Sequence, residues 1–360
     1  MARRRKSAAR TSGFPVLRHP IIEQAESRQP AAPARSSAAR RSLLVAAKVV
    51  VSAGLLAAVA AASDLAALKA LLVRLDLLHA VLAVALLAGI AAVSGLRWWL
   101  VGRAIGAPLP LKDCVALMFV GSFFTQVLPT SVGGDAVRIL LAGRRGLPYG
   151  RAFSGVMLER ASGLLALVIM VAGGALWLGA RLDPPALGLV LLLALPGLLA
   201  VLALLCVLDS LPLPAPFAQL ARPLLALAGD ARRVMLAPQA SLALLLLSAV
   251  AQLLAVGAAC LLARGLGLPL GFADSLALVP AIMLITFFPL SVAGWGVREG
   301  AAIVLLGTAG IATDGALAVS VLFGLGLLTA GLPGLVIWLV AGRAGRSRLG
   351  SLVEGSAPRL

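Results

Sequence analysis

The sequence predicts an all-α polytopic membrane protein with two inverted-topology repeats, each made of three spanning helices plus one re-entrant helical hairpin. Three observations lead to this prediction. The 360 residues are 61% hydrophobic and only 12% charged, with a mean hydropathy of +1.04. A ten-residue motif occurs twice, 160 residues apart. The positive charges gather in alternate segments between the hydrophobic stretches, as in proteins that cross a membrane several times.

The composition also excludes several classes of protein. A soluble domain carries far more charge, and a β-barrel shows short alternating segments in place of long Ala- and Leu-rich stretches. The three cysteines lie singly in apolar stretches and the two histidines are far apart, so we expect no disulfide framework, metal site or cofactor. The net charge of +17 is expected to orient the chain in a membrane, not to bind nucleic acid.

The elements follow in chain order. Residues 1–42 are rich in Arg, Ala, Ser and Pro, which predicts a disordered basic cytoplasmic tail, and 342–360 form a second basic cytoplasmic tail. A helix needs about 20 residues to cross the bilayer core. Six stretches reach this length: 43–62, 78–101, 152–180, 186–208, 240–263 and 315–341.

Two further apolar regions are interrupted by the repeated motif. Its first copy is Pro129-Thr-Ser-Val-Gly-Gly-Asp-Ala-Val-Arg138, and its second, Pro289-Leu-Ser-Val-Ala-Gly-Trp-Gly-Val-Arg298, is identical at six of ten positions. The apolar pieces on either side are too short to cross a membrane, so we predict re-entrant hairpins at about 113–146 and 274–309. Irregular backbone at membrane depth is tolerated where it faces protein or a watery cavity, so the tips are expected to line one.

These elements form repeat 1 at 43–180 and repeat 2 at 181–341, and a second repeated block, Arg103–Asp113 and Arg264–Asp274, agrees with this division. Three crossings per repeat invert the second repeat, which brings the two hairpin tips together near the midplane. With a cytoplasmic N-terminus, 24 of the 31 Lys and Arg residues, Arg97 among them, lie inside and five lie outside.

The predicted cytoplasmic linker 209–238 contains three prolines, followed by Leu and Ala residues with Arg222, Arg232 and Arg233. It is either a short amphipathic helix on the membrane surface or a plain connection between the repeats.

The hairpin tips have the residue types of an anion-binding site. Pro129 is expected to end the inward half-helix, Gly133 and Gly134 to make a tight turn, and Asp135 to cap the returning helix. That helix N-terminus and the guanidinium of Arg138 favour a phosphate or carboxylate. Ser131 adds a hydroxyl group, and the second tip repeats the pattern with Pro289, Ser291, Gly294 and Arg298.

The charged residues near the tips leave two interpretations open. Arg138 either faces a ligand or pairs with Asp135, and Arg298 either faces a ligand or pairs with Glu299. Charges at membrane depth require a function or a partner.

Two adjacent charges, Glu159 and Arg160, lie in the third predicted span. We expect one of them to meet a hairpin charge, either Glu159 with Arg138 or Arg160 with Asp135, in a network that either contacts a ligand or is purely structural.

Four tryptophans complete the candidate residues. Trp98, Trp99 and Trp338 lie near span ends and are predicted interfacial anchors. Trp295, at the tip position that matches Asp135, either caps the cavity or faces the outer interface.

The run from Phe123 to Leu165, with Leu-Pro-x-x-x-Gly-Gly-Asp-x-x-Arg followed by Glu159-Arg160-x-x-Gly163, resembles the membrane region of lysylphosphatidylglycerol synthases, the flippase half of the multiple peptide resistance factor. Gly294-x-Gly296-x-Arg298-Glu299 also matches the family, and the resemblance covers about 43–341. It implies a lipid translocase or a protein that handles lipid-linked substrates, as a stand-alone member without the aminoacyl-transferase domain. Relatives often have an arginine in the last span where this chain has Gly324 or a neighbour.

The sequence and the resemblance together predict a bacterial inner-membrane, flippase-like lipid translocase, not an enzyme, with both termini cytoplasmic. A phospholipid, aminoacyl-phospholipid or glycolipid headgroup would move through a central cavity between the hairpins. The expected partners are membrane lipids with anionic or zwitterionic headgroups and lipid-synthesis enzymes. The predicted substrate-binding residues are Ser131, Gly133, Gly134, Asp135, Arg138, Glu159, Arg160, Ser291, Gly294, Arg298 and Glu299.

Two alternatives stay open. One is an integral-membrane enzyme that acts on a lipid-linked phosphate, with Asp135 or Glu159 as acid or base. The other is a non-catalytic scaffold of a lipid-synthesis complex that uses the basic N-terminal tail.

Overall fold

The computed structural model describes residues 65–128, 132–178, 185–208, 215–287 and 291–354, together with Val50 and Gly54. The chain divides into two units, Met1–Leu44 and Val45–Leu360, and every described residue belongs to the second unit. The predicted tail 1–42, nearly all of the predicted span 43–62, the breakers Pro129 and Pro289, and Ser131 lie outside the described residues.

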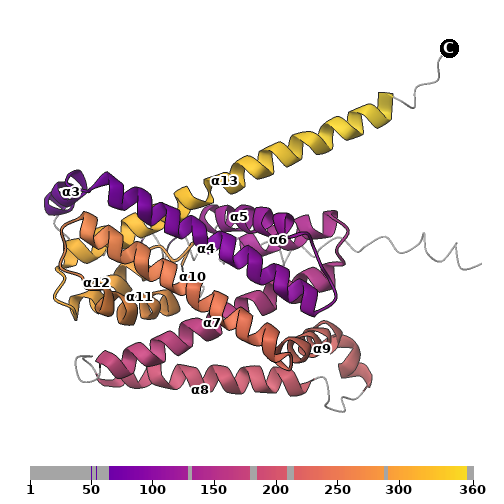
Figure 1. The fold of residues 1–360 in the computed structure, drawn as a ribbon, viewed down its shortest axis with the longest axis horizontal. Coiled ribbons are helices and arrows are strands. Elements are labelled where there is room, and N and C mark those ends of the chain that lie inside the picture. Colours follow the sequence, from indigo (N-terminus) through magenta and orange to yellow (C-terminus); the bar gives the residue numbers. More distant parts are fainter. Residues whose placement is uncertain are drawn as a thin grey trace, which may run out of the picture. The chain divides into compact units, whose positions relative to one another are not determined.

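The described residues form eleven helices, labelled α3 to α13 (Figure 1). Their bounds are α3 Leu65–Val73, α4 Leu77–Ala104, α5 Leu111–Val127, α6 Gly133–Arg144, α7 Tyr149–Leu178, α8 Pro185–Leu208, α9 Ala215–Met235, α10 Pro238–Gly265, α11 Phe272–Phe287, α12 Val297–Gly307 and α13 Thr313–Glu354.

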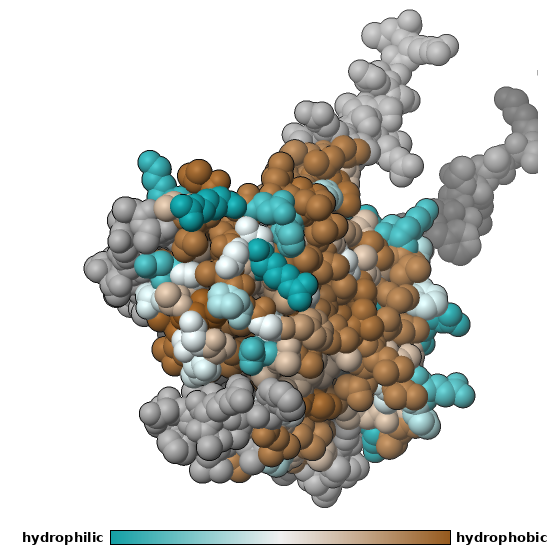
Figure 2. All heavy atoms as spheres, turned by 60° about the vertical axis from the view of Figure 1, so that its left-hand side comes forward, coloured by the Kyte–Doolittle hydropathy of each residue, from teal (hydrophilic) through white to brown (hydrophobic). Residues whose placement is uncertain are grey.

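Four of these helices, α4, α7, α10 and α13, are long and apolar enough to cross a membrane. They coincide with four of the six predicted spans, and α8 covers a fifth at 186–208. Large apolar side chains on these helices are exposed, and Figure 2 shows apolar residues over much of one face. Such a surface is stable against lipid and not against water. The chain is therefore a helical membrane protein.

The predicted linker contains helix α9, Ala215–Met235, so this segment is not a plain connection; its position on the membrane surface stays a prediction. Ala228, Ala231 and Val234 are buried on one face, whereas Arg222 is exposed on another. The buried carboxylate of Asp230 accepts a hydrogen bond from Arg151 of α7 at 2.5 Å, which attaches α9 to α7. The short helix α3 was not predicted.

The order of the helices recurs along the chain. Helices α4 to α7 have 28, 17, 12 and 30 residues, and α10 to α13 have 28, 16, 11 and 42. The repeated block around Arg103 and Arg264 ends α4 and α10. Gly106 and Gly267 follow the last helical residues with φ of 71° and 70°. Residues with a Cβ resist this left-handed conformation, so the block is a helix C-terminus in both halves.

Helices α4 and α10 pack against each other in antiparallel directions (Figure 1). The N–H of Asp76, just before α4, donates to the carbonyl oxygen of Gly265 at the end of α10, at 3.0 Å. Further along both helices, Nη1 of Arg97 donates to Oγ of Ser248 at 2.9 Å. The remaining contacts are reciprocal, since α5 packs on α13 and α11 packs on α7. Each first short helix thus lies against the last long helix of the other half.

The N-terminus of α4 is capped by a side chain. The carboxylate of Asp76 accepts the N–H of Leu78 at 2.8 Å and contacts Nδ1 of His79 at 2.7 Å. The hydrogen bond with His79, together with that from Leu78, lowers the pKa of Asp76 because both favour its charged form.

Candidate functional site

The first motif forms the start of α6, and its local structure corrects two predictions. Gly133 and Gly134 are the first two helical residues and have no positive φ, so they do not make a tight turn. The N-cap position belongs to Val132, and Asp135 is the third residue of the helix. Gly134 serves close packing instead, because a Cβ there would overlap the carbonyl oxygen of Gly121 in α5. The carboxylate of Asp135 is consequently directed to other side chains.

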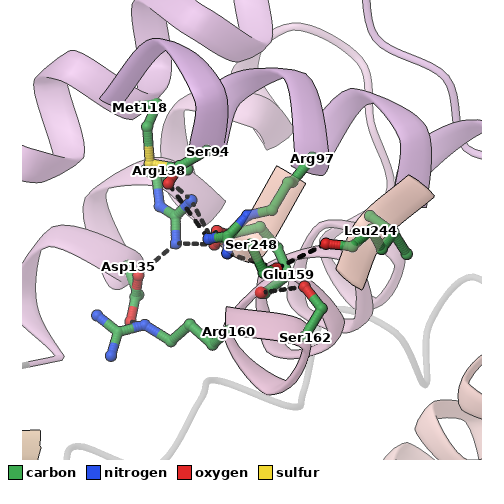
Figure 3. Close-up of polar contacts among 10 residues, drawn as sticks. All are labelled: Ser94, Arg97, Met118, Asp135, Arg138, Glu159, Arg160, Ser162, Leu244 and Ser248. Atoms are coloured by element: carbon green, nitrogen blue, oxygen red, sulfur yellow. Dashed lines mark hydrogen bonds and ion pairs between the residues drawn. The ribbon is translucent and has the colours of Figure 1, made fainter. Parts of the chain in front are cut away.

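A buried chain of ion pairs joins α4, α6 and α7 (Figure 3). Nη2 of Arg138 donates to Oδ1 of Asp135 at 2.5 Å, and Nη1 lies 3.4 Å from Oε2 of Glu159. Nε of Arg160 pairs with Oδ2 of Asp135, and Nη2 of Arg97 pairs with Oε1 of Glu159. The predicted pairs of Glu159 with Arg138, of Arg160 with Asp135, and of Arg138 with Asp135 are confirmed.

Arg97 and Trp98 are buried, although the sequence analysis put Arg97 among the cytoplasmic charges and Trp98 at the membrane interface. Arg97 is 6% exposed and donates to Ser94 and Ser248 as well as Glu159. Trp98 is 2% exposed, and its ring centroid lies 5.3 Å from Cζ of Arg138. Helices α5 and α7 cover this part of α4. The block at 103–106 ends the helix, so residue 97 lies well inside it. This feature of the sequence could have indicated that Arg97 is not a loop residue.

Glycines leave the space that the arginine side chains occupy. A Cβ on Gly121 would lie 2.6 Å from Cγ of Arg138, and one on Gly163 would lie 2.9 Å from Nη1 of Arg97. Gly324 of α13 stands against the guanidinium of Arg298 in the same way. The chain has no arginine near Gly324, and the glycine leaves room there for the guanidinium of Arg298.

The second motif has a different backbone from the first. Helix α12 begins at Val297, four residues later in the motif than α6 does, so the preceding residues form turns. Ala293, Gly294 and Gly296 have φ of 50°, 82° and 86°. Among the described residues of the two copies, the left-handed turn conformation occurs in the second, where two glycines meet the conformational requirement.

The charges of the second motif form a closed pair. Nη2 of Arg298 donates to Oε1 of Glu299 at 2.8 Å, and Oγ of Ser320 lies 3.2 Å from each partner. Oε2 of Glu299 accepts the N–H of Gly296 at 2.6 Å, which caps α12. Trp295 lies against this pair, with its ring centroid 4.8 Å from Cζ of Arg298. The predicted alternative in which Arg298 pairs with Glu299 is therefore present.

Two adjoining cavities of about 290 and 340 Å³ lie between the two motifs. Asp135, Arg138 and Glu159 line the first, and Ser291, Gly294 and Arg298 line the second, whereas Gly133, Gly134 and Glu299 line neither. The polar residues common to both walls are Ser94, Arg97, Thr125, Gln126, Arg160 and Gln252. Because the two cavities share walls, both motifs face one hollow.

This hollow retains hydrogen-bonding capacity. Oε1 of Gln126, Oγ of Ser291 and Nε of Arg97 are buried atoms with no hydrogen-bond partner among the described residues. Gln252 was not predicted as a site residue. A single amide side chain in the middle of an apolar helix is the sequence feature that could have indicated it. A polar ligand in the hollow would find both hydrogen-bond donors and acceptors.

The charge balance of the hollow favours an anion. Around the first motif, Arg97, Arg138 and Arg160 face the carboxylates of Asp135 and Glu159, so the ionised group has one net positive charge. Inside protein, an uncompensated charge of this kind attracts a counterion strongly. Within the described part of the chain, no cluster of three His, Cys, Asp or Glu side chains is arranged to hold a metal ion.

The fold and the site define a class: helical membrane proteins with a charged cavity enclosed between two recurring groups of helices. The particular family follows from a family model, described as the lysylphosphatidylglycerol synthase TM region, which matches residues 45–334. The chain belongs to this family, as the sequence motifs predicted. A comparison with curated proteins found no match.

Proposed function

We propose that the protein is a flippase-like translocase of the bacterial inner membrane that moves an anionic or zwitterionic lipid headgroup through the hollow between the two motifs. The observation that carries the proposal is the net positive charge of the buried network that lines this hollow. Charged side chains at membrane depth point to a function or a partner, and in this network the guanidinium groups outnumber the carboxylates by one. Membrane lipids are the natural source of such anions.

In this proposal, α5–α6 and α11–α12 are re-entrant hairpins. Helix α5 has 17 residues and α12 has 11, which correspond to about 25 and 16 Å of helix. The bilayer core is about 30 Å thick, so neither helix crosses it. The described motif residues that line the hollow, Asp135 and Ser291 among them, then lie at membrane depth.

The same proposal makes the two halves inverted repeats, 43–180 and 181–341. The antiparallel packing of α4 on α10 supports it, because equivalent helices in antiparallel contact are related by a two-fold axis perpendicular to them. Rocking of the halves about this axis would open the hollow to each side in turn. Both termini, the linker 209–238 and the basic tails then lie in the cytoplasm.

Translocation of labelled lipids in proteoliposomes tests the function. The panel contains an anionic phospholipid, an aminoacyl-phospholipid and a glycolipid. We expect the wild type to move at least one of them, and Arg138→Ala and Arg298→Ala to reduce its rate by about tenfold or more, since each loses a buried charge. Arg103→Ala is the matched control, because Arg103 lies over the ring of Trp99 and lines neither cavity.

Thermal unfolding in detergent is measured for each variant. If an alanine variant is unfolded, Arg138→Lys or Arg298→Lys replaces it in the transport assay, because lysine keeps the positive charge. Absence of transport above empty liposomes for every lipid overturns the proposal. The lipid-linked phosphate enzyme and the scaffold then become the hypotheses to pursue.

A further inference from the structure

We propose that Arg160 binds the phosphate of a lipid headgroup, and that Asp135 is a counterion which this phosphate displaces from Arg160. The inference rests on the proposed function and divides the labour within its site. It places the phosphate of the headgroup on one side of the hollow.

The two motifs differ in the charge they offer a ligand. Arg298 and Glu299 form a neutral pair, 3% and 0% exposed, and Ser320 and the Gly296 amide complete their hydrogen bonds. An anion at this motif would have to break a pair that also caps a helix. The excess positive charge lies at the first motif, so the phosphate is expected there.

Among the three arginines of the network around the first motif, all of which line the hollow, Arg160 has the most exposed side chain. The side chains of Arg97 and Arg138 are 7% and 3% exposed, whereas that of Arg160 is 33% exposed. Arg160 also lines both cavities, so it stands where a headgroup would pass from one to the other. In Figure 3 its guanidinium lies beside the carboxylate of Asp135.

Asp135 can release Arg160 without becoming an isolated buried charge. Its other oxygen, Oδ1, accepts a hydrogen bond from Arg138 at 2.5 Å. It also lies in the first turn of α6, where the helix dipole stabilises an anion. Arg138 meanwhile keeps its contact with Glu159. In the proposed exchange, a phosphate replaces the carboxylate of Asp135 as the partner of Arg160. Every charge of the network then still has a partner.

The neighbours of Arg160 suit the remaining phosphate oxygens and the polar alcohol attached to them. Gln126, Gln252 and Ser94 line both cavities and are uncharged donors and acceptors. A phosphodiester carries one negative charge, which balances the one net positive charge of the network. Binding of the phosphate would thus make the hollow neutral, as passage through a membrane requires.

The test measures equilibrium binding of dihexanoyl-phosphatidylglycerol to the purified full chain in detergent. We expect Arg160→Gln to weaken binding by about tenfold or more, because a charge-assisted hydrogen bond is lost. Asp135→Asn is expected to tighten binding by about tenfold, since the competing carboxylate is neutralised. Arg103→Gln, which removes one positive charge outside the network, is expected to bind like the wild type.

The double variant Asp135→Asn with Arg160→Gln distinguishes two effects of Asp135. One is competition with the phosphate for Arg160, and the other is repulsion of the phosphate by a nearby negative charge. If Asp135 competes for Arg160, its replacement has no effect once Arg160 is gone. A full tenfold gain in the Arg160→Gln background overturns the proposal. Dihexanoylglycerol, which lacks phosphate, is expected not to bind, and inorganic phosphate is expected to compete with the lipid.

The outcomes distinguish this inference from the function on which it rests. If the wild type translocates lipid but Arg160→Gln binds and transports normally, the assignment of Arg160 is wrong and the function stands. If the wild type moves only a lipid without phosphate, this inference is wrong and the function stands, and if it moves no lipid of the panel, both proposals are overturned. Melting temperatures of all variants show whether a loss of binding reflects unfolding.

Discussion

The three buried arginines among the described residues, Arg97, Arg138 and Arg298, each have a carboxylate partner and a glycine that makes room for the side chain. Pairing is required because an isolated charge inside a membrane protein is costly. The sequence offered Asp135, in the first motif, and Glu159, in the third predicted span, as partners of Arg138 and Arg160, and the structure contains these pairs. It did not predict Arg97, because nothing local in the chain shows that a carboxylate 62 residues away lies beside it.

Glu159 is the residue whose loss should most disturb the fold. Glu159→Gln leaves both Arg97 and Arg138 without the carboxylate between them, and we expect a loss of about 3–5 kcal/mol in unfolding free energy. Asp113→Asn is the matched control, because its pair with Arg145 is partly exposed and is worth about 0–1 kcal/mol. Thermal and denaturant unfolding in detergent measure both. Equal stability of the two variants would contradict a structural role for the network.

At the scale of helices, small residues decide how closely the short helices approach their neighbours. Gly134 of α6 touches α5, and Gly334 of α13 would, with a Cβ, lie 2.7 Å from the backbone nitrogen of Val120 in α5. The predicted interruptions by Pro and Gly placed the short helices correctly. The prediction of a tight turn at Gly133 and Gly134 was wrong. A Gly-Gly pair fits both a turn and a close contact between helices, and the neighbouring helix decides which of the two forms.

Gly134→Ala is expected to separate α5 from α6 and to destabilise the protein by about 1–3 kcal/mol, because the added methyl group meets backbone atoms that have no room to move. Gly300→Ala in the equivalent short helix α12 is the control, since nothing lies within 4 Å of the added Cβ. There we expect no loss, or a small gain from helix propensity. The melting temperatures of the two variants check this, and a neutral Gly134→Ala would show that the close contact is dispensable.

At the scale of the molecule, the reciprocal packing of α5 on α13 and α11 on α7 surrounds the antiparallel pair of α4 and α10. This arrangement makes both motifs face the same hollow although they are 160 residues apart. If the halves are inverted repeats, the start of α7 and the start of α13 lie on opposite sides of the membrane.

Single cysteines test this topology. Gly150→Cys at the start of α7 and Thr313→Cys at the start of α13 are both exposed positions, and the native cysteines are replaced by serine. A membrane-impermeant maleimide is expected to label Thr313→Cys in intact cells and Gly150→Cys only after the membrane is opened. Labelling of both residues from the same side would rule out inversion.

The sequence by itself determined the class of protein, the family, the order of long and short helices, and the two motifs that face the hollow. These properties depend on local composition and on repetition along the chain, which need no knowledge of neighbours in space. Tertiary structure alone decided that Arg97 and Gln252 belong to the site, that the second motif is a neutral pair, and that Arg160 reaches the cavity. Burial and pairing of a charge are set by the helices packed around it, and those helices come from distant parts of the chain.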